Sequence, residues 1–534
     1  MKICRPAIAL AALGSMIVAC SSPHAHPGAA VSSPPAMTAE RPPVATTERT
    51  PCPPTANANG AVECGALTVP EHQAQPSGPT ITVAYAVIHH SGPTAKPDPI
   101  LWIDYDAGEG FLTDRINRVT NGKPGLLADR DIVVLDFRGT GTSKPALDCP
   151  EVTALERTTF FRTVDESSSE GRALVRTAVT QCHDRLMAAG VDLAAFNTDE
   201  SAADLDGLRQ ALGFKSWDII AGQYGVRVAL KEMQEYPATV RAAVLVGAVA
   251  PDGDRYLAAI RGTDQAFSSL THDCRADSGC NAVFDPTGDL RAVLAQVSPT
   301  RHLNPGDATS FLFDPARIQQ EVRTIMSDST FVDWLPFDLH GPNPLGGYLG
   351  FDMVASASSY VGQTLWNIGP AETDSNHGAF FLGAYLSVVC REDVPFTDPA
   401  ALARVAAGSL AASALGDPGD LDECAAWKVP AVNAASRAAT AIAPPTIVFH
   451  GAYDPTTSTS DTQQVVTELQ HGFEYEVPGV STYPTYVNPA NQSTASQCAF
   501  TIRNNFLDDP SRVPDSSCLA SATGAAFQFS SMLG

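Results

Sequence analysis

The chain has 534 residues, and its hydrophobic fraction of 44% is enough for the core of one large domain with an insertion, or of two domains. Its formal net charge of −24 at pH 7 argues against nucleic acid and anionic membrane surfaces as partners, because like charges repel. A globular enzyme, a binding protein and a structural protein all fit this composition.

The N-terminus predicts an export signal. Residues 1–19 combine a short basic region with an apolar run that is too short to span a bilayer. Small residues just before Cys20 resemble a bacterial lipobox, in which Cys20 becomes the lipidated first residue of the mature protein. An ordinary cleaved signal peptide with an incidental cysteine is the alternative. Residues 20–50 are rich in Pro, Ala, Ser and Thr and are expected to form a flexible tether. We therefore expect an exported bacterial envelope protein that is attached to the membrane only through its lipid.

The cysteine content supports export. Ten cysteines follow Cys20, and an even number in an exported chain implies disulfides. The sequence does not fix their connectivity, but pairing nearest neighbours is the economical expectation. The chain has no C-x-x-C pair and its histidines are scattered, so we expect neither a zinc nor a redox site, and no cofactor. The expected pairs are Cys52–Cys64, Cys149–Cys182, Cys274–Cys280, Cys390–Cys424 and Cys498–Cys518.

In chain order, short apolar and β-branched runs predict strands and amphipathic runs predict helices. Strands that alternate with helices indicate a mostly parallel α/β sheet. A long segment breaks this alternation and is expected to be a lid, at residues 253–430, between core segments 51–252 and 431–534. The expected strands are 67–70, 80–88, 100–103, 131–137, 217–220, 241–249, 446–450 and 473–477, and the expected helices are 201–213, 226–234 and 460–470.

One turn stands out, Ala-Gly-Gln-Tyr-Gly at 221–225, between the strand 217–220 and the helix 226–234. Small residues around a strand-to-helix turn are what a nucleophile elbow needs, because its central residue is held in a strained conformation. An active elbow reads G-x-S-x-G, whereas the central residue here is Gln223. A primary amide is not a nucleophile, and a nearby base cannot make it one.

Several motifs along the chain resemble one family. Residues 131–143 end in D-x-R-G-x-G-x-S, residues 451–455 read G-x-x-D-P, and two cysteines close the C-terminal segment, at 498 and 518. Together they resemble the exported tripeptidyl-aminopeptidase and prolyl-iminopeptidase branch of the α/β-hydrolase superfamily. The resemblance implies an α/β-hydrolase fold, with a mostly parallel sheet, helices on both faces and a large lid insertion. It also implies an ancestral serine peptidase.

The resemblance implies three catalytic-triad positions in this chain, and two of them no longer have the catalytic residue. The nucleophile position falls on Gln223, the acid on Asp454 and the base on Thr482, where the family has a histidine. The one histidine downstream of Asp454 is His471, which precedes the last strand and so lies at the wrong end of the sheet. In such hydrolases the histidine takes the serine proton and the acid orients the histidine. Asp454 therefore has no catalytic partner to orient.

A third part of the site also departs from the family. The loop after the strand 100–103 carries Asp104, Asp106 and Glu109 where the family uses glycines to supply an oxyanion-hole N–H. Carboxylates beside an oxyanion are expected to repel the developing charge.

The remaining polar residues of these motifs are expected to be structural. We expect Asp454 to cap its turn, Asp136 and Arg138 to fix their loop as a pair, Ser143 to lie in a turn and His450 to be a satisfied core or rim histidine.

Two acidic residues follow Cys390. Glu392 and Asp393 match in kind the lid carboxylates with which such exopeptidases hold a substrate's amino terminus, as the resemblance implies. Arg391 could instead pair with one of them, and a solvated loop is the favoured interpretation.

Three hypotheses remain open. The first is a non-catalytic protein that binds a peptide or small molecule in the cleft under the lid, or a protein on its surface. The second is an active hydrolase with a rewired site, such as water activated by a carboxylate of the acidic loop. The third is a structural envelope protein.

Overall fold

The computed structural model describes residues 45–53, 61–122, 129–155, 164–165, 167–297, 301–303, 311–329, 331–340, 379–438, 441–485, 493–524 and 527. All of them belong to one compact unit, residues 42–534. The expected signal peptide, Cys20 and most of the expected tether lie outside the described residues. Within the described ranges, every helix is too short or too polar to cross a membrane.

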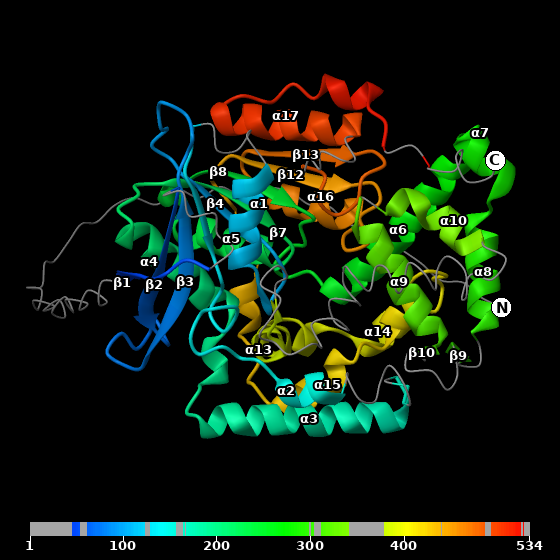
Figure 1. The fold of residues 1–534 in the computed structure, drawn as a ribbon, viewed down its shortest axis with the longest axis horizontal. Coiled ribbons are helices and arrows are strands. Elements are labelled where there is room, and N and C mark those ends of the chain that lie inside the picture. Colours follow the sequence, from blue (N-terminus) through cyan, green and yellow to red (C-terminus); the bar gives the residue numbers. More distant parts are fainter. Residues whose placement is uncertain are drawn as a thin grey trace, which may run out of the picture. The chain divides into compact units, whose positions relative to one another are not determined.

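The described residues form a nine-stranded sheet in the order β1-β2-β3-β6-β4-β7-β8-β12-β13 (Figure 1). The strands from β6 to β13 in this order pair in parallel, and β1, β2, β3 and β6 pair antiparallel. The mostly parallel α/β fold expected from the sequence is confirmed. The strands are β1 (Thr46–Arg49), β2 (Val62–Pro70), β3 (Thr80–Ile88), β4 (Ile100–Asp104), β6 (Ile132–Leu135), β7 (Trp217–Gly222), β8 (Val240–Val246), β12 (Thr446–Gly451) and β13 (Gly472–Val477).

Helices cover both faces of the sheet, because the central strands are apolar on both sides. On β7, Ile219 and Ala221 face one core and Ile220 faces the other. The first core includes side chains of α4 (Thr198–Ala211), α5 (Tyr224–Glu235) and α16 (Thr459–Glu468). The second includes side chains of α1 (Leu112–Gly122) and α17 (Thr494–Asp508), and Figure 1 shows α17 running alongside β13.

Strand β1 lies within the segment 20–50 that the sequence assigns to the tether. Thr46–Arg49 pairs antiparallel with β2 along its whole length. Its four side chains are exposed, so no apolar pattern marked it as a strand. The core sheet therefore begins before the expected boundary at residue 51.

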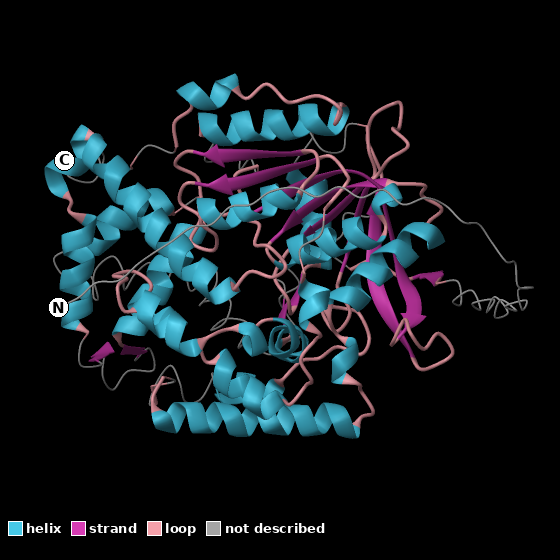
Figure 2. Cartoon of the chain, turned by 180° about the vertical axis from the view of Figure 1, so that it is seen from behind, coloured by secondary structure: helices cyan, strands magenta, loops and turns pink. Residues whose placement is uncertain are grey.

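The segment 253–430 contributes helices that form two packed groups beside the sheet (Figure 2). One group shares a core made by α6 (Arg255–Ala276), α8 (Pro286–Gln296), α9 (Pro315–Ser327) and α10 (Leu335–His340). The other joins α13 (Leu382–Glu392) and α15 (Asp420–Trp427) to α2 (Pro150–Leu155) and α3 (Ser169–Ala188). Helices α2 and α3 precede the turn at Gln223, so the helical group extends beyond the expected lid. Shorter elements are α7 (Ser278–Val283), α14 (Pro399–Ala406), β5 (Glu109–Gly110), β9 (Arg301–Leu303), β10 (Phe311–Phe313) and β11 (Ala379–Phe380).

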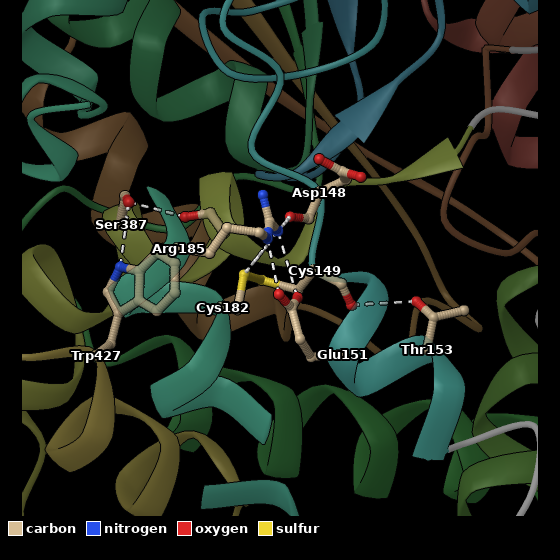
Figure 3. The surroundings of a disulfide bond; sticks show 9 residues. Asp148, Cys149, Glu151, Thr153, Cys182, Arg185, Ser387 and Trp427 are labelled. Carbon is tan, nitrogen blue, oxygen red and sulfur yellow. Dashed lines mark hydrogen bonds and ion pairs between the residues drawn. A yellow bond between two sulfur atoms is a disulfide. The ribbon is translucent and has the colours of Figure 1, made fainter. Parts of the chain in front are cut away.

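All five expected disulfides are present. Cys149–Cys182 ties α2 to α3, and Figure 3 shows its surroundings. Arg185 of α3 donates to Glu151 at 2.7 Å and to the carbonyl of Asp148 at 2.7 Å. The covalent link and these hydrogen bonds hold the two helices together beneath α13 and α15.

Candidate functional site

Gln223 lies at the sharp turn between β7 and α5. Its backbone has φ 52° and ψ −126°, a conformation that residues with a side chain rarely adopt. The turn also brings the start of α5 close to β4, because a Cβ atom added at Gly225 would lie 1.6 Å from the carbonyl oxygen of Ile103. The backbone is thus that of a nucleophile elbow, with an amide where the nucleophile would stand.

The Gln223 side chain does not cap α5, and its buried Oε1 accepts no hydrogen bond from the described residues. An unpaired buried amide oxygen costs free energy, as does the strained backbone.

Asp454 follows β12 and is almost fully buried. Its Oδ1 accepts from Thr456 N–H at 2.9 Å, from Thr456 Oγ1 at 2.6 Å and from Thr482 Oγ1 at 3.2 Å, and its Oδ2 accepts from Thr457 Oγ1 at 2.8 Å. The expected turn cap is therefore present, and the residue at the base position also contacts the acid. Hydroxyl and backbone donors occupy both carboxylate oxygens.

The three triad positions lie at the same edge of the sheet. Gly222 pairs with Val246, and Val246 pairs with Phe449, so the carboxyl ends of β7, β8 and β12 meet. A Cβ atom added at Gly247 would lie 3.1 Å from Asp454 Oδ2. One added at Gly222 would lie 3.6 Å from the ring of Tyr483, the neighbour of Thr482. Ligands of open α/β sheets bind at this edge.

His471 lies at the opposite end of the sheet. Its carbonyl accepts from the N–H of Thr446, the first residue of β12, at 3.0 Å. It therefore cannot replace the missing base at the carboxyl edge.

The acidic loop after β4 is held together by its own carboxylates. Asp104 forms a buried ion pair of 2.6 Å with Arg115. Asp106 Oδ1 accepts from the N–H of Ala107 at 2.9 Å, and Glu109 Oε2 accepts from the N–H of Asp106 at 2.7 Å. Burial, and then the nearby Asp106, raise the pKa of Glu109 to about 8, so Glu109 is mostly protonated at pH 7. Besides any repulsion by the remaining carboxylates, two N–H groups of the loop are occupied and unavailable to an oxyanion.

Glu392 and Asp393 are buried, so the expected solvated loop is wrong. Glu392 accepts from Thr198 N–H at 2.8 Å and from Thr198 Oγ1 at 2.5 Å. Arg227 of α5 donates to Asp393 at 2.7 Å and to Glu392 at 3.4 Å. Their shared cationic partner is therefore Arg227 rather than Arg391, and Arg255 lies 3.8 Å from Asp393 as well. Buried charges need such partners, and these carboxylates are already committed within the protein.

Asp136 and Arg138 both fix loops, as expected, but not as a pair. Arg138 forms a bidentate pair with Asp204, at 2.7 Å and 2.8 Å. Asp136 accepts from the N–H groups of Leu112 at 2.9 Å and Thr142 at 2.8 Å. The sequence could not reveal these partners, because each lies at least six residues away.

Ser143 and His450 have structural roles. Ser143 Oγ donates to the carbonyl of Asp136 at 2.9 Å and accepts from the N–H of Ala84 at 3.0 Å. His450 is fully buried, with Nε2 3.1 Å from Glu476 and 3.2 Å from Thr459. Ser143 is satisfied by its neighbours, whereas His450 is satisfied only at Nε2, because its buried Nδ1 has no hydrogen-bond partner among the described residues and lies 3.7 Å from Glu474.

Two pockets lie near α5. The smaller has an empty volume of about 240 Å³ and adjoins the elbow through Tyr224, the residue after Gln223. Apolar side chains line much of it, with lid helix α13 on one side; they include Phe137, Phe196 and Val388. The larger pocket, of about 420 Å³, lies along α5 and is lined by Arg227, Lys231 and Arg437 among others. The described residues contain no group of three His, Cys, Asp or Glu placed to hold a metal ion.

Sequence reasoning missed Arg227 and Arg437. Arg227 stands four residues after Gln223, so it lies one turn further along the elbow helix, and that spacing was a usable signal. Arg437 gave no such signal, because it lies in a short 3-10 helix, Ala434–Arg437, that meets α5 only in the folded chain.

Known proteins resemble this chain over most of its length. Residues 112–268 match the family described as alpha/beta hydrolase fold, and residues 414–518 match the family described as TAP-like protein. The chain is 28% identical over 429 residues to "Serine protease Hip1" of Mycobacterium tuberculosis, covering 76% of this chain and 78% of that protein. It is 28% identical over 249 residues to "Tripeptidyl aminopeptidase" of Streptomyces lividans, covering 45% of each. A crystal structure of proline iminopeptidase from Mycobacterium smegmatis is 13% identical, with 83% of this chain and 98% of that chain covered and a TM-score of 0.36.

The sheet order, the turn at Gln223 and the family matches define an α/β-hydrolase-fold protein. More narrowly, the chain is similar to the TAP-like proteins and to peptidases of that superfamily.

Proposed function

We propose that this chain is an exported, lipid-anchored α/β-hydrolase-fold protein that has lost serine-hydrolase activity and binds a peptide or other small ligand. One observation carries the proposal: the strained elbow is retained around Gln223, while Thr482 at the base position donates to Asp454. The geometry of a hydrolase site is kept, but its chemistry is not.

Each catalytic step lacks the chemical group that would carry it out. The amide of Gln223 cannot attack a carbonyl, and a threonine hydroxyl has no basic nitrogen to take a proton. In the loop after β4, the N–H groups of Asp106 and Ala107 already donate to carboxylates of the loop. Restoring one group alone therefore leaves the others missing.

The pocket beside the elbow supports retained binding. Apolar side chains line much of it, so its chemistry suits an apolar side chain or the apolar end of a peptide. Glu392 and Asp393 are paired with Arg227 and are not free to hold a substrate's amino terminus. We therefore expect binding that depends on an apolar group and not on a free amine.

A rewired hydrolase is the second candidate, and one observation favours it. The pKa of Glu109, about 8, is near the value that a general base needs at neutral pH. However, its Oε2 is engaged by the N–H of Asp106, which opposes this role.

A fluorophosphonate probe tests the loss of the serine nucleophile, with an active serine hydrolase in the same tube as positive control. We expect the control to be labelled and this chain to remain unlabelled. Stoichiometric labelling of this chain would show an activated serine elsewhere and would overturn the proposal.

Binding is tested by titrating tripeptides with free and with blocked amino termini and recording the melting temperature. We expect a saturable rise for peptides with an apolar end residue, whether or not the amine is blocked. Val388→Phe, which fills the pocket beside the elbow, should remove the effect, whereas Val405→Phe at an exposed position should not. No saturable binding by any peptide would favour a purely structural protein.

A further inference from the structure

The larger pocket lies along the elbow helix but includes none of the three triad positions. Its empty volume, which includes space open to solvent, is about 420 Å³. Residues of α4, α5, the end of α13 and the loop after α15 line it, including Thr198, Arg227, Lys231, Glu392, Ser436 and Arg437. It can therefore act independently of any chemistry at Gln223.

Two of its three cations are neutralised within the protein. Arg227 pairs with Asp393 at 2.7 Å and with Glu392 at 3.4 Å. Lys231 Nζ lies 3.1 Å from Asp199 and 3.0 Å from Glu235. These charges are satisfied without a ligand.

Arg437 is different. Its Nη2 donates to the carbonyl of Gly253 at 2.8 Å, and its guanidinium lies 4.3 Å from the ring centre of Phe396. No carboxylate in the described part of the chain forms an ion pair with it, and its Nε is buried without an acceptor. A buried donor that lacks an acceptor is costly, and for a charged group the cost is larger.

Charges of both signs act on Arg437. Burial lowers the pKa of Arg437 and the nearby positive charge of Arg227 lowers it further, whereas the carboxylates of Asp393, Asp252 and Glu392 act in the opposite direction. An anion between the two guanidinium groups would supply the missing acceptor and reduce their repulsion. The planar guanidinium presents paired N–H donors that match carboxylate and phosphate oxygens.

We propose that this pocket binds a small molecule through a compact oxyanion, a carboxylate or a phosphate, with Arg437 as the principal contact. The net charge of −24 repels anions at long range, so such binding has to arise from the local arrangement of donors. A saturable, site-specific effect is therefore expected, in contrast to general salt screening.

The experiment titrates acetate and inorganic phosphate separately into the full chain at constant ionic strength, by calorimetry and by melting temperature. We expect saturable binding of at least one probe, and the stronger of the two identifies the class of oxyanion. Arg437→Gln should weaken that binding about tenfold or more, since a charge-assisted hydrogen bond is lost. Arg404→Gln removes the same charge from an exposed position on α14 and should leave the affinity unchanged.

Arg437→Lys keeps the charge but loses the planar guanidinium, so we expect an affinity between those of the unmodified chain and Arg437→Gln. If Arg437→Gln does not fold, the lysine variant still tests the proposal. Binding that is equal in the unmodified chain and in a folded Arg437→Gln variant contradicts the proposal, as does the lack of saturable binding of both probes. Hydrolase activity, measured on the same preparation, is a separate result and does not bear on this site.

Discussion

The hydroxyl of Thr482 donates a hydrogen bond of 3.2 Å to Asp454, between the loops that follow β13 and β12. The contact joins the positions of base and acid in the triad that the family resemblance implies. Threonine keeps the link to Asp454 but cannot pass a proton from a nucleophile to a leaving group. The site has thus kept its shape, while Thr482 and Asp454 form a hydrogen bond with each other.

The first prediction concerns rebuilding the triad. Gln223→Ser alone should give no activity on tripeptidyl anilides, because no base would take the serine proton. Gln223→Ser with Thr482→His should recover a little turnover, since Asp454 is already placed to orient a histidine at 482. Initial rates of the two purified variants check this. Equal rates in both would show that the residue at 482 does not act on the nucleophile.

The second prediction concerns the occupied loop N–H groups. Adding Asp106→Gly to the double variant removes the acceptor of the Ala107 N–H and should raise the recovered rate. Asp106→Asn is the matched control, because its side-chain oxygen can still accept that hydrogen bond. An equal gain from asparagine and from glycine would point instead to charge repulsion, because both substitutions remove the charge.

The third prediction concerns backbone strain at Gln223. Glycine tolerates a φ of 52°, whereas alanine does not, so Gln223→Gly should be more stable than Gln223→Ala by about 1 kcal/mol. Denaturant unfolding of both variants measures the difference. An alanine variant that is as stable as the glycine variant would mean that the elbow relaxes when the glutamine is removed.

The fourth prediction concerns pH. Burial raises the pKa of Glu232 to about 8, and other carboxyl groups, Glu321 and Asp333, are raised to about 7. Between about pH 5 and pH 8 the folded protein therefore holds more protons than the unfolded chain. The free energy of unfolding should fall as the pH rises through this window, and denaturant titrations across it test the sign.

Glu232→Gln provides the control for the pH effect. Glu232 is fully buried and accepts from Trp217 Nε1 at 2.9 Å, a hydrogen bond that a glutamine oxygen can also accept. In this variant the free energy of unfolding should fall less steeply with pH, by up to about 1.4 kcal/mol per pH unit, which is the contribution of one proton. A decline identical to that of the unmodified chain would mean that Glu232 does not hold the extra proton.

The sequence predicted the elements whose signal is local. The apolar run 217–220 and the small residues around Gln223 gave the elbow, which the structure shows from Trp217 to Glu235. Nearest-neighbour pairing predicted the disulfides correctly, because each cysteine is bonded to its neighbour in the order of cysteines along the chain. Local composition was sufficient in both cases.

What the sequence did not reveal depends on distant parts of the chain. Arg227 and Asp393 are 166 residues apart, and only folding brings α5 to the end of α13. Strand β1 escaped notice because its exposed side chains carry no apolar pattern and its pairing with β2 alone defines it. The hydrogen bond from the Ala107 N–H to Asp106 is local, but it depends on a loop conformation that composition does not encode.

The fifth prediction concerns export, which rests on the N-terminal sequence alone. Cys20→Ala should abolish labelling by a radioactive fatty acid and leave unprocessed or soluble protein. A serine substitution at Cys4, within the expected signal peptide, should not affect labelling. Normal lipid labelling of Cys20→Ala would refute the lipobox interpretation.

The most direct test of the account is the turnover of tripeptidyl and aminoacyl anilides and simple esters by the unmodified chain. Removal of triad members lowers rates by on the order of 10⁴ to 10⁶, so we predict turnover near the limit of detection. A rate on the order of 10 s⁻¹, typical of enzymes, would contradict the account if it co-purified with this chain and survived Gln223→Ala.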